Sequence, residues 1–182
     1  MLRSDRHERG RRPRLRPLLL SGGASWPTSS PGFAHLLRHR DRRRPPDRPT
    51  VVFLCGHNAG RSQMARGWFT RLAGDQADAW SGGSEPADQV NPIAVAAMAE
   101  VGVDISGERP RRWTESMLEA ADIVVTMGCG DTCPFVPGTR HEDWVLEDPA
   151  GRDLAAVRPI RDALRTCGDA LLASLDLPGS PP

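Results

Sequence analysis

The chain has 182 residues, 38% of them hydrophobic, and its 24 basic and 23 acidic side chains leave a formal net charge of +1. This length suits one soluble domain. No apolar run approaches the roughly 18 residues that a membrane helix needs, and the apolar stretch at residues 18–20 is too short for a signal peptide. Four cysteines without the framework of a small disulfide-rich domain indicate reduced thiols in the cytoplasm.

Charge is distributed unevenly along the chain. Residues 1–49 hold 13 arginines and 4 acidic residues, a net of +9, whereas residues 50–182 hold 11 arginines and 19 acidic residues, a net of −8. The first segment is rich in Arg, Pro, Ser and Gly and has no helical or strand period, so we expect a disordered extension. A basic arm for nucleic acid or anionic lipid is the alternative, but no aromatic residues interleave with the arginines as in a recognisable module. The predicted domain spans residues 50–177, followed by a disordered tail at 178–182.

The most informative stretch lies at the start of this domain, where the sequence reads Val-Val-Phe-Leu-Cys-Gly-His-Asn-Ala-Gly-Arg-Ser over residues 51–62. The four leading apolar residues predict a buried strand. From residue 61 to residue 72, apolar side chains recur at helical spacing and predict a helix. Cys55 and Arg61 therefore bracket a Cys-x5-Arg loop that joins a strand to a helix.

Such a loop is suited to hold a tetrahedral oxyanion. Its backbone N–H groups converge at the positive end of the helix dipole, and Gly56 and Gly60 permit a close approach. The guanidinium of Arg61 can bind two oxygens of one anion. The same field favours the thiolate of Cys55 as a nucleophile, and Ser62 can donate a hydrogen bond to the sulfur. The residues expected around the anion are Gly56, His57, Asn58, Ala59, Gly60, Arg61 and Ser62. A chance Cys-x5-Arg pattern is the alternative, and the flanking strand and helix argue against it.

Strands and helices are predicted to alternate through the rest of the domain, which is typical of a doubly wound parallel α/β sheet with helices on both faces. Asn91 and Thr114 are expected to cap helices. The predicted elements after the first helix are a strand at 79–83, a helix from 92, a short helix from 115, a strand at 122–127, a strand at 142–146 and a helix at 153–175.

An Asp-Pro pair follows the last predicted strand. Asp148 is a candidate site residue, and the role expected for it depends on the family resemblance given below. Pro149 restricts the backbone of Asp148 to extended geometry. The alternative is that Asp148 and Pro149 form only a turn.

Two further cysteines, Cys129 and Cys133, follow the strand at 122–127. In a parallel sheet this is the ligand-binding edge, where Cys55 is also expected. A zinc site is not expected, because no second pair of ligands has suitable spacing. A redox role and a purely structural role both remain open for this pair. Cys167 lies on the apolar stripe of the last helix and is expected in the core.

The run Cys-Gly-His-Asn-Ala-Gly-Arg-Ser-Gln-Met-Ala from Cys55 resembles the active-site loop of arsenate reductases of the low-molecular-weight tyrosine phosphatase family. The phosphatases usually carry a second cysteine and Arg-Ser-Pro here, whereas this chain has Gln63 in place of that proline. The resemblance covers roughly residues 50–175. It implies four strands in the order 2-1-3-4, and it agrees with the roles given above to Cys55 and Arg61. It also implies that Asp148 is the general acid, because expelling an oxygen from arsenic or phosphorus is slow unless that oxygen is protonated. It also implies that a serine, better Ser81 than Ser84, binds Asn58.

The resemblance implies arsenate reduction to arsenite through a covalent adduct on Cys55, with weak phosphatase side activity. The alternative is a tyrosine phosphatase that hydrolyses phosphate monoesters. That family usually places an aromatic residue after Asp-Pro, where this chain has Ala150, although Trp113 could form a rim. A third possibility is an idle oxyanion-binding or redox-sensing module.

No bound cofactor is expected, but arsenate reduction needs a thiol. Thioredoxin-coupled relatives carry two resolving cysteines seven residues apart, and the closer spacing of Cys129 and Cys133 departs from that pattern. It looks more like reductases that pass the adduct to a small thiol such as mycothiol, with mycoredoxin as the coupled protein. We therefore favour mycothiol over thioredoxin, and expect no membrane or nucleic-acid partner.

Overall fold

A computed structural model describes residues 48–128, 135–175 and 177. The chain divides into two units at residues 38 and 39, and every described residue belongs to the second unit. Most of the predicted extension, the tail at 178–182 and both Cys129 and Cys133 lie outside the described residues. No helix in the described part of the chain is both long and apolar enough to cross a membrane.

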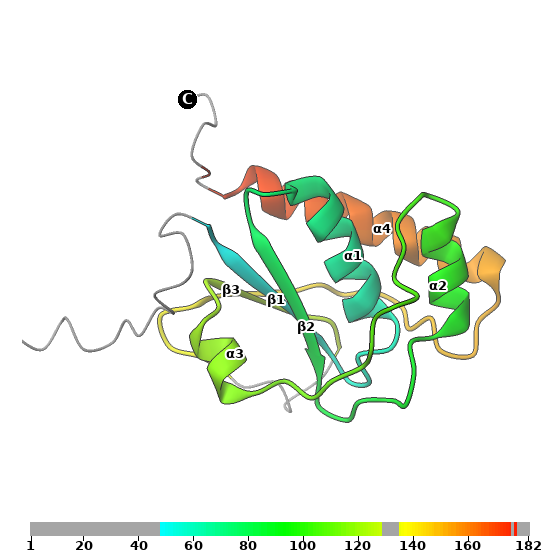
Figure 1. Ribbon diagram of the computed structural model, residues 1–182, viewed down its shortest axis with the longest axis horizontal. Helices are drawn as coiled ribbons and strands as arrows, with labels where there is room; N and C mark the ends of the chain where they lie inside the picture. The colour runs from blue at the N-terminus through cyan, green and yellow to red at the C-terminus, as the bar shows by residue number, and fades with distance from the viewer. Residues whose placement is uncertain (1–47, 129–134, 176, 178–182) are drawn as a thin grey trace, which may run out of the picture. The chain divides into compact units, whose positions relative to one another are not determined.

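The described residues build a four-stranded sheet in the order β2-β1-β3-β4 (Figure 1). All three strand pairs are parallel, with Cys55 beside Gly83 and Leu54 beside Thr126. The predicted strand order and the parallel α/β class are therefore confirmed. The strands are β1 (Thr50–Cys55), β2 (Asp78–Gly83), β3 (Ile123–Thr126) and β4 (Arg140–Asp143).

Helices lie on both faces of this sheet (Figure 1). Three helices pack over one face and the short α3 packs over the other. Asn91 accepts hydrogen bonds at the start of α2, and Thr114 does so at the start of α3, as the sequence predicts. The helices are α1 (Arg61–Ala73), α2 (Pro92–Ala99), α3 (Glu115–Glu119) and α4 (Leu154–Ala173).

Strand β1 is buried along its whole length because layers cover both of its faces. Val51 and Phe53 point into the larger core under α1, α2 and α4, while Val52 and Leu54 point into the smaller core under α3. The ring of Phe53 lies 5.6 Å from the rings of Phe69 and of Trp144. This packing fixes the carboxyl end of β1, where Cys55 lies.

The last strand differs from the prediction. The sequence predicts a strand at 142–146, but β4 ends at Asp143, because its neighbour β3 ends at Thr126 and pairs that residue with Asp143. The next residue, Trp144, is buried, whereas Val145 is 92% exposed. The apolar run of residues 144–146 thus supplies a buried Trp144 and a half-buried Leu146 to the core without extending the strand.

A buried arginine joins α2 to α4. Arg161 lies on the inner face of α4, donates to Ala97 O at 3.0 Å and pairs with Glu100 and Asp162. Glu100 also pairs with Arg158 at 2.6 Å. The sequence pattern did not predict that Arg161 is buried, because a charged side chain is normally expected to face solvent. Cys167, on the same helix, is half-buried against the core.

The ion pair between Glu100 and Arg158 is expected to make the free energy of unfolding depend on pH. Hydrogen bonding from Arg158 lowers the pKa of Glu100 from 4.5 to about 2. A carboxylate with a lowered pKa stabilises the fold above its unfolded pKa, and this contribution disappears as pH falls through the folded value. We expect Glu100→Gln to lower the free energy of unfolding at neutral pH, with the difference from the parent protein shrinking between pH 4.5 and about 2. Urea unfolding over this pH range measures the difference, with Glu119→Gln on an exposed site of α3 as the control. A difference that does not change with pH would contradict this assignment.

Candidate active site

Cys55 is the last residue of β1, and Arg61 is the first residue of α1. The Cys-x5-Arg loop therefore lies at the carboxyl edge of the parallel sheet, as predicted. The Cys55 side chain is almost fully buried, and its Sγ lies 3.0 Å from Ser62 Oγ. Among the loop residues between them, His57 is exposed and Asn58 is buried. The sequence prediction that Ser62 contacts the sulfur agrees with this geometry.

Asn58 occupies the inside of the loop with a backbone φ of 48°, a conformation that asparagine tolerates better than most residues. Its Nδ2 donates to Ser62 Oγ at 2.8 Å. Its Oδ1 accepts from Gln63 Nε2 at 3.1 Å and from the backbone N–H of Arg111 at 2.9 Å. These hydrogen bonds to Ser62, Gln63 and Arg111 fix the conformation of the loop around Asn58.

The serine expected to bind Asn58 does not do so. Among the hydrogen bonds of the described residues, none joins Asn58 to Ser81, which is buried in β2. Ser84 instead donates to Gly56 O at 3.5 Å. Gln63 and the backbone N–H of Arg111 hydrogen-bond to Asn58 in place of the expected serine. The sequence did not predict either contact, and the Arg111 contact depends on how the loop after α2 folds back.

Arg61 meets the candidate acid directly. Its Nη2 lies 2.7 Å from Asp148 Oδ2, and its Nη1 donates to Leu146 O at 3.3 Å. The other carboxylate oxygen of Asp148 accepts from the backbone N–H of Ala150 at 3.0 Å. The three residues expected to act together, Cys55, Arg61 and Asp148, therefore belong to adjoining segments at one edge of the sheet.

Close backbone contacts fix this arrangement. A Cβ added at Gly60 would lie 2.6 Å from Pro149 Cγ, so the loop and the Asp-Pro turn touch only because residue 60 is glycine. Asn91 joins the same two segments, since its backbone N–H donates to Ala59 O at 2.8 Å and its Nδ2 to Pro149 O at 3.4 Å. A Cβ at Gly128 would lie 2.9 Å from Arg61 Nη1, which places the end of the described segment after β3 against the guanidinium.

Cys129 and Cys133 lie outside the described residues, whereas Trp113 and Cys167 are described. Trp113 is half-buried against the smaller core under α3, and its backbone N–H donates to Gly83 O at 3.3 Å, at the end of β2 beside Cys55. Burial and, less strongly, the charge of Glu142 raise the pKa of the Cys167 thiol, which suits a structural residue. Within the described residues, no group of three or more His, Cys, Asp or Glu side chains could hold a metal ion.

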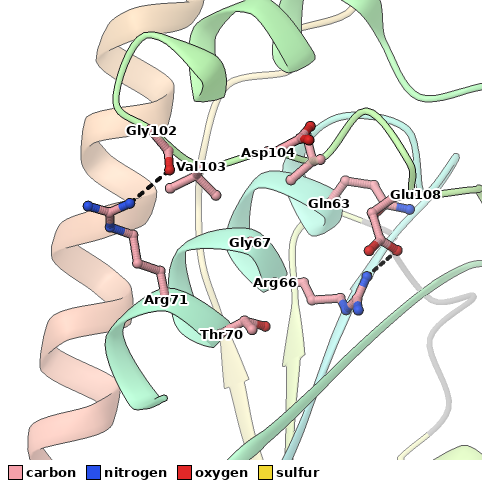
Figure 2. Close-up of a pocket in the computed structure, with 10 residues that line it drawn as sticks. Gln63, Arg66, Gly67, Thr70, Arg71, Gly102, Val103, Asp104 and Glu108 are labelled. Atoms are coloured by element: carbon pink, nitrogen blue, oxygen red, sulfur yellow. Dashed lines mark hydrogen bonds and ion pairs between the residues drawn. The ribbon is translucent and has the colours of Figure 1, made fainter.

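A separate cavity of about 240 Å³ lies beside α1 and not over Cys55 (Figure 2). Figure 2 shows Arg71 and Gly102 at one end of it and Gln63 and Glu108 at the other. Its charged side chains are already engaged, because Arg71 donates to Gly102 O at 2.8 Å and Arg66 pairs with Glu108. Gln63 is the one lining residue that also contacts the Cys-x5-Arg loop.

Comparison with known proteins agrees with this geometry. A family model described as low molecular weight phosphotyrosine protein phosphatase matches residues 50–178. The chain belongs to this family. Arsenate reductase 2 of Staphylococcus epidermidis is 40% identical over 124 residues, covering 66% of this chain and 93% of the relative. An arsenate reductase of Halalkalibacterium halodurans is 41% identical over 128 residues, covering 65% of this chain and 91% of the relative.

Solved structures of the family share the fold. The Corynebacterium glutamicum thioredoxin-dependent arsenate reductase matches with a TM-score of 0.61 and 36% identity over 70% of this chain, and the match spans 61% of that protein's length. A low molecular weight protein tyrosine phosphatase from T. tengcongensis matches with a TM-score of 0.63 and 25% identity, over 70% of this chain and 99% of that one. The resemblance inferred from the loop sequence is therefore confirmed at the level of family and fold.

The site geometry predicts selective protection of Cys55 by an oxyanion. We expect inorganic phosphate to slow the alkylation of Cys55 by iodoacetamide, because the anion would occupy the loop beside the sulfur. Arg61→Ala should remove most of this protection, whereas Arg165→Ala, on an exposed part of α4, should keep it. Peptide mass spectrometry quantifies the modification at each cysteine. Equal protection of Cys55 in the parent and in Arg61→Ala would show that the anion binds elsewhere.

Proposed function

We propose that this protein is an arsenate reductase that uses Cys55 as its nucleophile and thereby detoxifies arsenate. The observation that carries the proposal is the meeting of Cys55, Arg61 and Asp148 at one sheet edge. Named relatives that cover two thirds of the chain are arsenate reductases, which supports arsenate as the substrate.

The first step is attack of the Cys55 thiolate on arsenic. The loop amides and the guanidinium of Arg61 bind the arsenate oxygens and stabilise the negative charge that moves onto them. A bond forms between Cys55 Sγ and arsenic, and one arsenic–oxygen bond breaks. The departing oxygen leaves as water when Asp148 supplies a proton, which makes Asp148 the general acid.

Arg61 links binding to this acid step. Its guanidinium pairs with Asp148 at 2.7 Å. Arsenate oxygens compete for the same guanidinium. Binding of the substrate would therefore draw the guanidinium away from Asp148 and free this side chain to act at the departing oxygen.

Reduction itself requires two thiols. Arsenic gains two electrons as it passes from the pentavalent to the trivalent state, and two thiols lose these electrons when they join as a disulfide. The spacing of Cys129 and Cys133 favours a small thiol such as mycothiol, with mycoredoxin as the coupled protein. A thioredoxin-dependent relative supports thioredoxin as the competing route. Both routes use a thiol co-substrate and need no resident cofactor.

A protein tyrosine phosphatase is the second candidate, favoured by the family's description and by a phosphatase among the related structures. The same nucleophile, arginine and acid would hydrolyse a phosphate monoester. We assign phosphatase activity a minor part, because Ala150 follows the Asp-Pro pair where phosphatases of the family usually place an aromatic side chain.

Variants of the nucleophile and the acid test the proposed reaction. Cys55→Ser should abolish arsenate-dependent thiol consumption, and Asp148→Asn should lower kcat on the order of a hundredfold to ten-thousandfold, because the leaving oxygen loses its proton source. An exposed acidic residue outside the site, Asp169→Asn, serves as the control. The assay follows arsenite formation alongside hydrolysis of an aryl phosphate. Fast hydrolysis without arsenite would favour the phosphatase, and activity indifferent to Asp148→Asn would favour an idle or redox-sensing module.

Variants of the other cysteines identify the reductant. We expect Cys129→Ser and Cys133→Ser to retain arsenite formation with mycothiol and mycoredoxin, because a small thiol supplies the electrons from outside. If thioredoxin is the reductant, loss of either cysteine should abolish turnover, since the intramolecular disulfide could not form. The two variants are assayed with each reductant in turn, with Cys167→Ser as the matched control for loss of a thiol.

A further inference from the structure

We propose that Gln63 is a positioning residue for the Cys55 sulfur: its side-chain N–H fixes the orientation of the Asn58 amide, which in turn directs the hydroxyl proton of Ser62 toward the nucleophile. This inference rests on the proposed role of Cys55. It assigns a function to a residue that contacts neither the anion loop's backbone nor the sulfur itself.

The direction of each hydrogen bond follows from the groups involved. Backbone N–H groups and amide NH2 groups only donate, so Arg111 N and Gln63 Nε2 require that Asn58 presents its carbonyl oxygen to them. The Asn58 NH2 group then faces Ser62 Oγ at 2.8 Å and donates to it. Ser62 has a single proton, and its remaining close partner is Cys55 Sγ at 3.0 Å. A thiolate can only accept, so when Cys55 is ionised the Ser62 hydroxyl donates to its sulfur, and such a donor favours the thiolate.

Burial makes this chain of contacts effective. Cys55, Asn58, Ser62 and Gln63 are each at most 4% exposed. Water cannot compete for these hydrogen bonds, and electrostatic effects are larger in such surroundings than in solvent. A change at Gln63 is therefore expected to reach the sulfur through Asn58 and Ser62.

Gln63 is a poor residue for stability alone. Its Nε2 donates to Asn58 Oδ1 and, at 3.5 Å, to Arg109 O. Its Oε1 is buried, and no hydrogen-bond donor from the described part of the chain reaches it. A buried acceptor without a partner destabilises a fold, and an apolar side chain of similar shape would avoid this cost. Stability and positioning therefore make opposite demands at this position, and this opposition provides the test.

Gln63→Met separates the two roles. Methionine has a similar length but no hydrogen-bonding N–H, and it removes the unsatisfied oxygen. We expect thermal unfolding at the same or a higher temperature, together with a shift of the pH midpoint of Cys55 alkylation to higher pH. The alkylation rate near neutral pH should fall roughly two- to tenfold, the range expected for loss of one hydrogen bond. For arsenate reduction, kcat should fall more than KM rises, because Arg61 and the loop amides are unchanged.

Gln63→Glu should have the larger effect. A carboxylate offers only acceptors, so it repels Asn58 Oδ1 and opposes the amide orientation that Arg111 N and Ser62 require. Gln76→Met, at an exposed site after α1, is the matched control and should leave both unfolding and alkylation unchanged. The Cys55 peptide is followed by mass spectrometry in each case, with iodoacetamide as the probe.

A double variant tests the path of the effect. In Ser62→Ala the last link to the sulfur is already missing, so adding Gln63→Met should not shift the alkylation midpoint further. An equal shift in both backgrounds, or no shift in Gln63→Met alone, would overturn the proposal. These outcomes are independent of the reaction: a normal response of Cys55 alkylation without arsenite formation would reject only the proposed function, and arsenite formation with an unresponsive Cys55 would reject only the role of Gln63.

Discussion

The position of Cys55 depends on the pairing of β1 with strands on both sides. Parallel neighbours fix its register, and alternate side chains, such as Phe53 and Leu54, fill the cores on its two faces. A slip of one residue would exchange the two sets of side chains and bury the wrong face, so register and burial reinforce each other. The loop that follows Cys55 therefore begins from a fixed point. A site that must hold a small anion within hydrogen-bond distance of a sulfur needs such a support.

The sequence predicted the parts of the molecule that are set by local pattern. Continuous apolar runs predicted β1 and β3, and the capping residues Asn91 and Thr114 predicted the starts of α2 and α3. The Cys-x5-Arg loop was predictable for a related reason, because its chemistry lies in residues that are adjacent along the chain. Asp148 was found from its place after the last strand, although that strand ends earlier than the apolar run suggested.

Contacts between distant segments were not predictable in this way. Asn58 is held by the backbone N–H of Arg111, 53 residues away, and a backbone group leaves no trace in the residue type. The contact of Gly60 with the ring of Pro149 is a matter of space and appears only when the loop and the turn are placed together. Arg161 reads as a solvent-facing residue until the C-terminal carbonyls of α2 are brought against it. Each of these three contacts depends on tertiary structure, and the local sequence around the residue does not indicate it.

The net charge of residues 50–182 does not by itself favour the oxyanion binding that we propose. Residues 50–182 carry a net charge of −8, and a field of that sign disfavours the approach of arsenate or phosphate. Screening reduces this repulsion beyond roughly 10 Å in ordinary buffers. The affinity that we propose then depends on groups that would contact the anion, namely the loop amides and Arg61. Because Arg61 is already paired with Asp148, the anion has to offer the guanidinium better contacts than one carboxylate does. A doubly charged tetrahedral anion with several oxygens meets that condition more readily than a singly charged one. On this proposal, the ion pair between Arg61 and Asp148 selects for the charge of the anion and also connects anion binding to the proposed general acid.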